Sequence, residues 1–350
     1  MPVILRYVIN AVPYKSAQLS SADGRSCMRS GKSCRRNHRS VAVVSCRGVL
    51  GYAYLVLPFA KHACFAIGRS NVKGEANVFF CRVRRLRRTA KENQMKKLLN
   101  SLFISLSMYS ILPAPQKAWD ENSMKYVMAF MPIPGLICGV LMYLFTSFSM
   151  GTSINPMLFA AIMTIIPVII TGGLHLDGFA DTVDAISSPK DMETKLKILK
   201  DPNAGAFAVI YTAVYFVLTF GLWAQYGENP VLAMAIPLLW CLSKAMGALF
   251  VVSLTPARKS GLAYMFSDGA DKKWSKTAIS IEISLLLIAI LLINKVFFAI
   301  TAAVCIIAAL IFRRQTKRIF GGITGDLIGF FICAIELCFA ACLVVFSLII

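Results

Sequence analysis

The sequence predicts an all-α fold, a polytopic transmembrane helix bundle with about seven spans, and two observations support that prediction. Hydrophobic residues make up 57% of the 350 and charged residues only 15%, a balance that excludes an ordinary soluble chain. Apolar runs also recur after residue 95, and about 17 to 25 apolar residues cross a hydrocarbon core about 30 Å thick. The expected spans are 124–148, 156–171, 206–226, 231–254, 278–293, 296–312 and 327–350.

The first 94 residues differ from the rest of the chain. They contain 18 of the 37 Lys and Arg residues but only 3 of the 17 Asp and Glu residues, and they show no sustained helical or strand period. A targeting segment or a small basic domain would fit this composition. We favour a basic N-terminal extension over 1–94 that is not natively translated, because Met95-Lys96-Lys97 directly before an apolar segment is typical of a membrane-protein start. The membrane domain is then 95–350.

The loops between the spans predict an orientation. Four loops, at 113–125, 173–204, 255–276 and 313–325, hold 15 Lys and Arg residues, whereas the alternate loops hold only Lys295. Cytoplasmic loops carry the excess of positive charge, so these four loops are expected in the cytoplasm, in a multi-pass protein of the inner membrane. The segment 98–112 is short and contains five Ser or Asn residues, so we expect it to be interfacial or re-entrant.

An acidic motif follows the second expected span. Residues 171–184 read TGGLHLDGFADTVD, and in a helix Asp177, Asp181 and Asp184 share one face. Like charges at this spacing repel, and carboxylate oxygens suit Mg²⁺ or Mn²⁺ better than zinc. The motif therefore predicts a magnesium site, although a solvated helix face at the membrane border is the simpler alternative. His175 is a candidate proton acceptor or phosphate donor, or a structural residue at that border.

Other polar residues accompany the acidic motif on or next to the expected cytoplasmic loops. Lys200 could bind phosphate, although lipid headgroups or topology explain most lysines there. Lys244 and Glu336 fall within spans, where a charge is costly and a partner is expected. Arg258 opens one loop, and Asp326 ends a glycine-rich stretch in the last. The eleven cysteines form no CxxC pair, which gives no support to a zinc site.

Taken together, these motifs resemble the cobalamin synthase (adenosylcobinamide-GDP ribazoletransferase) family. The resemblance covers about 95–350. The matching motifs, in order, are GGLHLDGFADT at 172–182, Lys200-Asp201 with Gly205, Ala257-Arg258 with Gly261-Leu262, and GGITGD at 321–326.

The resemblance implies an enzyme for the last step of cobalamin nucleotide-loop assembly. A ribose hydroxyl of α-ribazole, or of its 5′-phosphate, attacks adenosylcobinamide-GDP, and GMP leaves. It also implies these site roles: Mg²⁺ on Asp177 and Asp181, Asp184 as third ligand or base, Arg258 and Lys244 on the diphosphate, and Asp326 closing the site. The family usually has Arg where Lys244 stands.

The expected partners are the two substrates and the lipid bilayer, with possible association with other cobalamin-pathway enzymes and with no nucleic acid. Two other functions remain open at the level of sequence. A CDP-alcohol phosphatidyltransferase also aligns aspartates at a membrane face, but its pattern has Arg where Asp181 follows Ala180. A secondary transporter would use Lys244 and Glu336 along a pathway, but it predicts an inverted repeat that the chain does not show.

Overall fold

The structure, a computed structural model, describes residue 92 and residues 94–115, 121–227 and 229–349. Nearly all of the predicted extension 1–94 lies outside these residues. A helix over 94–109 comes first. The labelled helices are α3 (Glu121–Met124), η1 (Val127–Phe130), α4 (Pro132–Met150), α5 (Pro156–Thr171), α6 (Leu174–Ser187), α7 (Met192–Ile198), α8 (Ala206–Gln225), α9 (Pro230–Ala233), α10 (Ala235–Ser253), α11 (Leu262–Gly269), α12 (Lys272–Ile293), α13 (Lys295–Phe320) and α14 (Gly325–Ile349).

The described residues form a helix bundle without strands, which confirms the predicted fold class. Six helices are long and apolar enough to cross a membrane, and α5 with α6 gives a seventh crossing if that bent pair is counted. The chain is therefore a multi-pass membrane protein. The helix over 94–109 is not among the spanning candidates of the described residues, and the interfacial position of 98–112 stays a prediction.

Several helix limits differ from the sequence prediction, and α12 begins at Lys272 instead of residue 278. The sixth expected span stops at residue 312, but α13 continues to Phe320 and carries the basic residues 313–318 on its last turns. Gly321 caps the C-terminal end of α13, and its φ of 72° lies in the left-handed region that favours glycine. Between α5 and α6, Gly172 and Gly173 adopt φ values of 60° and 77°, and the chain turns by 95°. We take α5 as the crossing and α6 as running across the end of the bundle.

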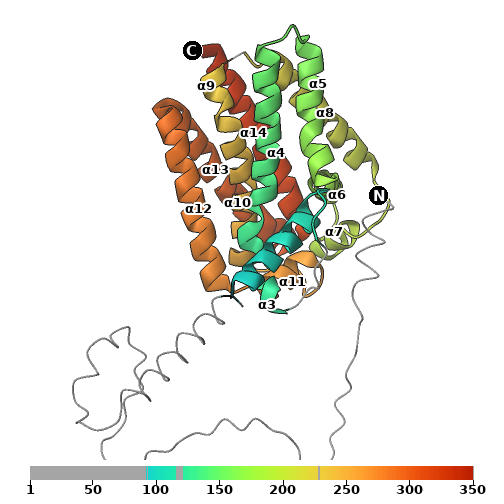
Figure 1. The fold of residues 1–350 in the computed structure, drawn as a ribbon. Helices are drawn as coiled ribbons and strands as arrows, with labels where there is room; N and C mark the ends of the chain where they lie inside the picture. The colour runs from blue at the N-terminus through green and yellow to red at the C-terminus, as the bar shows by residue number, and fades with distance from the viewer. Residues whose placement is uncertain (1–91, 93, 116–120, 228, 350) are drawn as a thin grey trace, which may run out of the picture. The chain divides into compact units, whose positions relative to one another are not determined.

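α10 and α14 are the central helices of the bundle. α10 contacts α4, α12 and α14, whereas α14 also contacts α6, α8 and α13. Figure 1 shows the long helices side by side, with the short helices α3, α7 and α11 at the end opposite the C-terminus. The acidic motif and the loops that follow α10 and α13 all lie at that end, because α7 follows the acidic motif, α11 follows α10, and α14 runs from this end to the C-terminus.

Candidate active site

α6 carries the acidic motif and lies tightly against the start of α14. The three aspartates lie on a continuous helix, as predicted, and all three are half-buried. A Cβ atom at Gly178 would stand 2.8 Å from the carbonyl oxygen of Asp326, and one at Gly329 would stand 2.9 Å from that of His175. The two glycines therefore let the helix backbones approach, and this contact brings Asp326 next to the acidic face.

The loops after α10 and α13 are joined by backbone hydrogen bonds. The N–H of Ala257 donates to the carbonyl of Ile323 over 2.9 Å, and the N–H of Ile323 donates to that of Thr255 over 3.0 Å. Gly322 is required at this contact, since a Cβ there would lie 2.4 Å from the Thr255 oxygen. The glycine-rich stretch before Asp326 thus has a packing role.

Arg258 is held beside Asp326 by that pairing. Its Nη2 lies 3.5 Å from Asp326 Oδ2, and its Nη1 donates to the carbonyl of Leu196 in α7 over 3.3 Å. Thr324 Oγ1 also donates to Asp326 Oδ2, over 3.2 Å. Two sequence motifs that are 68 residues apart thus meet at one carboxylate, which faces a partly exposed guanidinium.

The electrostatics of this face favour a bound cation. Burial, together with the neighbouring carboxylates of Asp177 and Asp326, raises the pKa of Asp181 to about 7. The pKa of Asp177 is also raised, first by burial and then by Asp326. Within the described part of the chain, no three His, Cys, Asp or Glu side chains stand close enough to enclose a metal. The site is therefore crowded with negative charge but is not a closed protein cage.

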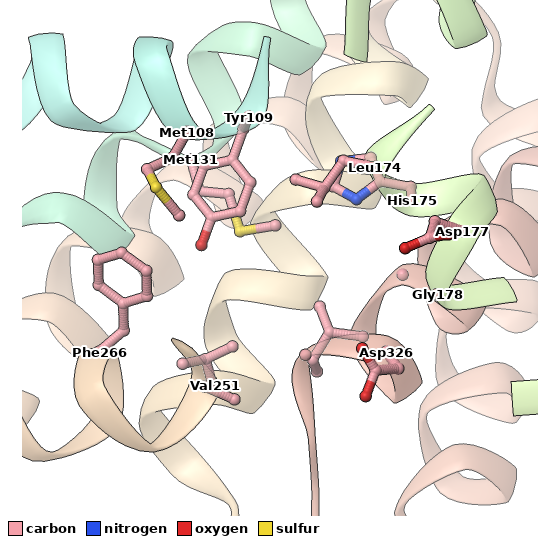
Figure 2. Close-up of a pocket in the computed structure, with 14 residues that line it drawn as sticks. Met108, Tyr109, Met131, Leu174, His175, Asp177, Gly178, Val251, Phe266 and Asp326 are labelled. Carbon is pink, nitrogen blue, oxygen red and sulfur yellow. The ribbon is translucent and has the colours of Figure 1, made fainter. Parts of the chain in front are cut away.

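A pocket of about 100 Å³ opens between the carboxylates of Asp177 and Asp326 and the helix over 94–109. Figure 2 shows Met108, Tyr109 and Met131 on one side, with His175 and Asp177 on the other. A second cavity of about 410 Å³ lies between α6, α13 and α14, but its lining is almost wholly apolar and holds no carboxylate. The smaller pocket is therefore the candidate reaction site.

The comparisons with known proteins agree with this arrangement. Residues 101–345 match the family model described as cobalamin-5-phosphate synthase. The chain belongs to this family. A protein of Lachnoclostridium phytofermentans named adenosylcobinamide-GDP ribazoletransferase is 36% identical over 241 residues, 69% of this chain and 92% of the relative. One of Clostridium botulinum with the same name is 37% identical over 257 residues, 71% of this chain and 99% of the relative. No solved structure matches the chain.

Membership of the cobalamin-5-phosphate synthase family confirms the resemblance seen in the sequence. It argues against the two alternatives, the CDP-alcohol phosphatidyltransferase and the secondary transporter. The motifs behind the resemblance gather largely at one place, since 172–182, 257–258 and 321–326 meet around Asp326.

Five predicted site residues of this cobalamin-5-phosphate synthase family member lie outside the pocket lining: Asp181, Asp184, Lys200, Lys244 and Arg258. Lys200 is exposed after α7. The carboxylate of Asp184 lies against Gly205 at the start of α8, where a Cβ would stand 2.2 Å from Oδ1. Lys244 is 1% exposed and pairs with Glu336, which also accepts a 2.6 Å hydrogen bond from Ser243. The structure thus gives the Lys244 ammonium a carboxylate partner inside the bundle instead of an open position beside Asp326.

The sequence interpretation missed the opposite wall of the pocket. Tyr109 stacks with His175 at 6.2 Å between ring centroids, and Phe266 of α11 lies 6.4 Å from Tyr109. Neither aromatic residue belongs to a charged or glycine-rich motif. The one available signal was the expectation that 98–112 is interfacial, since this segment includes Tyr109.

Proposed function

We propose that the chain catalyses the reaction for which its relatives are named, ribazole transfer to adenosylcobinamide-GDP, at the face formed by Asp177, Asp181 and Asp326. A ribose hydroxyl of α-ribazole, or of its 5′-phosphate, attacks the cobinamide-bearing phosphorus. The bond from that phosphorus to the GMP oxygen breaks, so cobalamin, or its phosphate, and GMP form. This is the last step of cobalamin nucleotide-loop assembly. The single observation that carries the proposal is the convergence of the family's motifs on one group of carboxylates and one arginine.

The chemistry of this group suits transfer at phosphorus. Such transfer requires positioning and charge stabilisation more than covalent help from the protein. Arg258 can donate hydrogen bonds to phosphate oxygens, and its two present contacts hold the guanidinium at the edge of the site. Asp184 lies on the same face of α6 as the other two aspartates and is the candidate acceptor for the hydroxyl proton.

Mg²⁺ fits the donor set of this site. Magnesium is usually held by one or two carboxylates and completes its shell with water and substrate phosphates, so a cage of three side chains is not required. Asp177 and Asp181 would hold the ion. Burial raises the pKa of both carboxyl groups most, and neighbouring carboxylates, whose repulsion a cation would relieve, raise it as well. When bound, the ion would neutralise charge on the phosphate oxygens.

The site is assigned to the cytoplasmic face of the inner membrane. The four basic loops hold 15 Lys and Arg residues against one in the alternate loops, and every motif of the site lies on or next to a basic loop. Both substrates would then enter from the cytoplasm. At this face the protein would also associate with other enzymes of the cobalamin pathway.

The proposal is tested with the purified full chain in lipid nanodiscs. GMP release from adenosylcobinamide-GDP should require both α-ribazole and Mg²⁺, and a corrinoid product should appear in equal amount. Repeating the assay with the 5′-phosphate identifies the preferred acceptor. Release without either acceptor, or no release with both acceptors and the metal present, would refute the proposal.

A further inference from the structure

The pocket beside the carboxylates has one polar wall and one apolar wall. The wall away from Asp177 and Asp326 is formed by Met131, Val251 and Phe266, together with side chains of the helix over 94–109. This composition excludes a highly charged group from the deeper part of the pocket, because such a group would lose its hydration without a partner. A flat, largely apolar group suits this deeper part of the pocket.

One buried polar atom in this pocket lacks a partner. His175 is 6% exposed and lines the pocket, and its Nε2 atom makes no hydrogen bond within the described part of the chain. Buried polar groups in folded proteins are almost always hydrogen-bonded, so an unpartnered one requires an explanation. A bound ligand with a single polar atom at its edge would give His175 Nε2 a hydrogen-bond partner.

The rings that line the pocket point to an aromatic ligand. The pocket, of about 100 Å³, opens toward the half-buried carboxylates of Asp177 and Asp326, so a larger group can extend out of it. The planes of Tyr109 and His175 are only 21° apart, so both rings present flat surfaces. Stacking against such surfaces is favourable for any flat aromatic group.

We infer that this pocket takes the aromatic base of the acceptor nucleoside, and that His175 Nε2–H donates a hydrogen bond to the unsubstituted ring nitrogen of that base. The inference rests on the proposed function and assigns the base subsite of the same site. Both substrates carry a base, but the benzimidazole of α-ribazole has an apolar ring and one free nitrogen, whereas guanine has polar groups on several edges. The single unpartnered nitrogen matches the benzimidazole, and the ribose then extends toward Asp177.

The test compares two acceptors with wild-type and His175→Phe protein, both as full chains in nanodiscs. The substitution keeps a ring in place and removes the N–H group. The acceptors are α-ribazole and its indole analogue, in which carbon replaces the unsubstituted nitrogen. We expect the KM for α-ribazole to rise about tenfold, the equivalent of one hydrogen bond, with kcat little changed. The KM for the indole analogue should be the same in both proteins.

The same experiment separates failure of this inference from failure of the proposed function. If wild-type protein releases no GMP with α-ribazole or with its 5′-phosphate, the proposed function fails. If wild-type protein is active and His175→Phe lowers kcat equally with both acceptors, only the base assignment fails, because His175 then acts in the chemistry or the fold.

A second variant tests the pocket without altering His175. Ala263 lines the pocket, and Ala263→Leu would fill part of it. We expect the KM for α-ribazole to rise about tenfold or more and the KM for adenosylcobinamide-GDP to stay constant. Ala299→Leu, on an exposed position of α13, is the matched control and should change neither constant. A rise confined to adenosylcobinamide-GDP would overturn the inference, since the pocket would then hold the guanine.

Discussion

Asp181 has four other aspartates acting on its carboxyl group. Burial is the largest cause of its raised pKa, and Asp177, Asp326, Asp184 and Asp201 all add to it in the same direction. A carboxyl group with a pKa near 7 is only partly ionised in a metal-free protein at neutral pH. The charge that attracts a cation is therefore itself dependent on pH.

Magnesium affinity should therefore rise with pH. In the folded chain the Asp181 carboxyl keeps its proton up to about pH 7, well above the ordinary value of 3.8, so protons compete with the metal below pH 7. Between pH 6 and pH 8 the affinity should increase about tenfold as the ionised fraction increases. Titration calorimetry with Mg²⁺ at pH 6, 7 and 8 measures this. An affinity that does not change over this range would contradict the assigned role of Asp181.

Substitution of the two assigned ligands should abolish turnover without removing the protein from the membrane. Asp177→Asn and Asp181→Asn each replace a charged ligand by a neutral one of the same size, and we expect kcat to fall by about 10² to 10³. Asp268→Asn, on an exposed position of α11, is the control and should keep wild-type activity. Activity close to wild type in both ligand variants would refute the metal assignment. GMP release and membrane content are the two measurements.

At the scale of elements, the Lys244–Glu336 pair joins α10 to α14. Both side chains are almost fully buried. Asp326 lies in the first turn of α14, and α10 leads into the loop of Arg258. The pair therefore fixes the register of the two helices that bring Arg258 and Asp326 together. A buried charge without its partner is strongly destabilising, whereas an apolar pair of similar volume can be tolerated.

Removing one member of the pair should therefore lower the free energy of unfolding more than removing both members does. Lys244→Met alone should lower stability by about 3 to 5 kcal/mol, and Lys244→Met with Glu336→Leu should recover most of that loss. Thermal unfolding in detergent measures the stability of each variant. GMP release by the double variant tests the other interpretation of Lys244, as a diphosphate contact: near-normal activity would exclude that role, and loss of activity in a stable protein would support it.

The sequence predicted some of these elements well, for physical reasons. The helix of α6 and its shared aspartate face follow from spacing alone, and the long apolar runs mark the spans. The bend before α6 and the extension of α13 depend on which glycines adopt positive φ, and the sequence contains more glycines than the structure uses in that way. The partner of Lys244 was not predictable, because Glu336 lies 92 positions away.

At the scale of the molecule, the site is assembled at one end of the bundle. The loops of the site belong to elements that are far apart in sequence but come together where α6, α10 and α14 meet. Family resemblance identified the residues before their contacts were known. It could not identify the apolar wall from the helix over 94–109, since no pattern in the sequence links Tyr109 to His175.

The predicted orientation can be measured directly. Ser260 and Thr152 are exposed residues of loops expected on opposite sides of the membrane. In a chain without accessible native cysteines, Ser260→Cys should react with an impermeant maleimide only in inside-out vesicles, and Thr152→Cys only in intact cells. The reverse pattern would place the acidic face outside the cytoplasm.

The central claim is that Asp177 and Asp181 hold a divalent ion against the phosphates of the substrate. The most direct test is a structure of the full chain with adenosylcobinamide-GDP and Mn²⁺, in which the anomalous signal locates the ion. We predict one peak at bonding distance, about 2 Å, from carboxylate oxygens of both aspartates and from a phosphate oxygen. A metal bound to the phosphates with no contact to either carboxylate would contradict the claim.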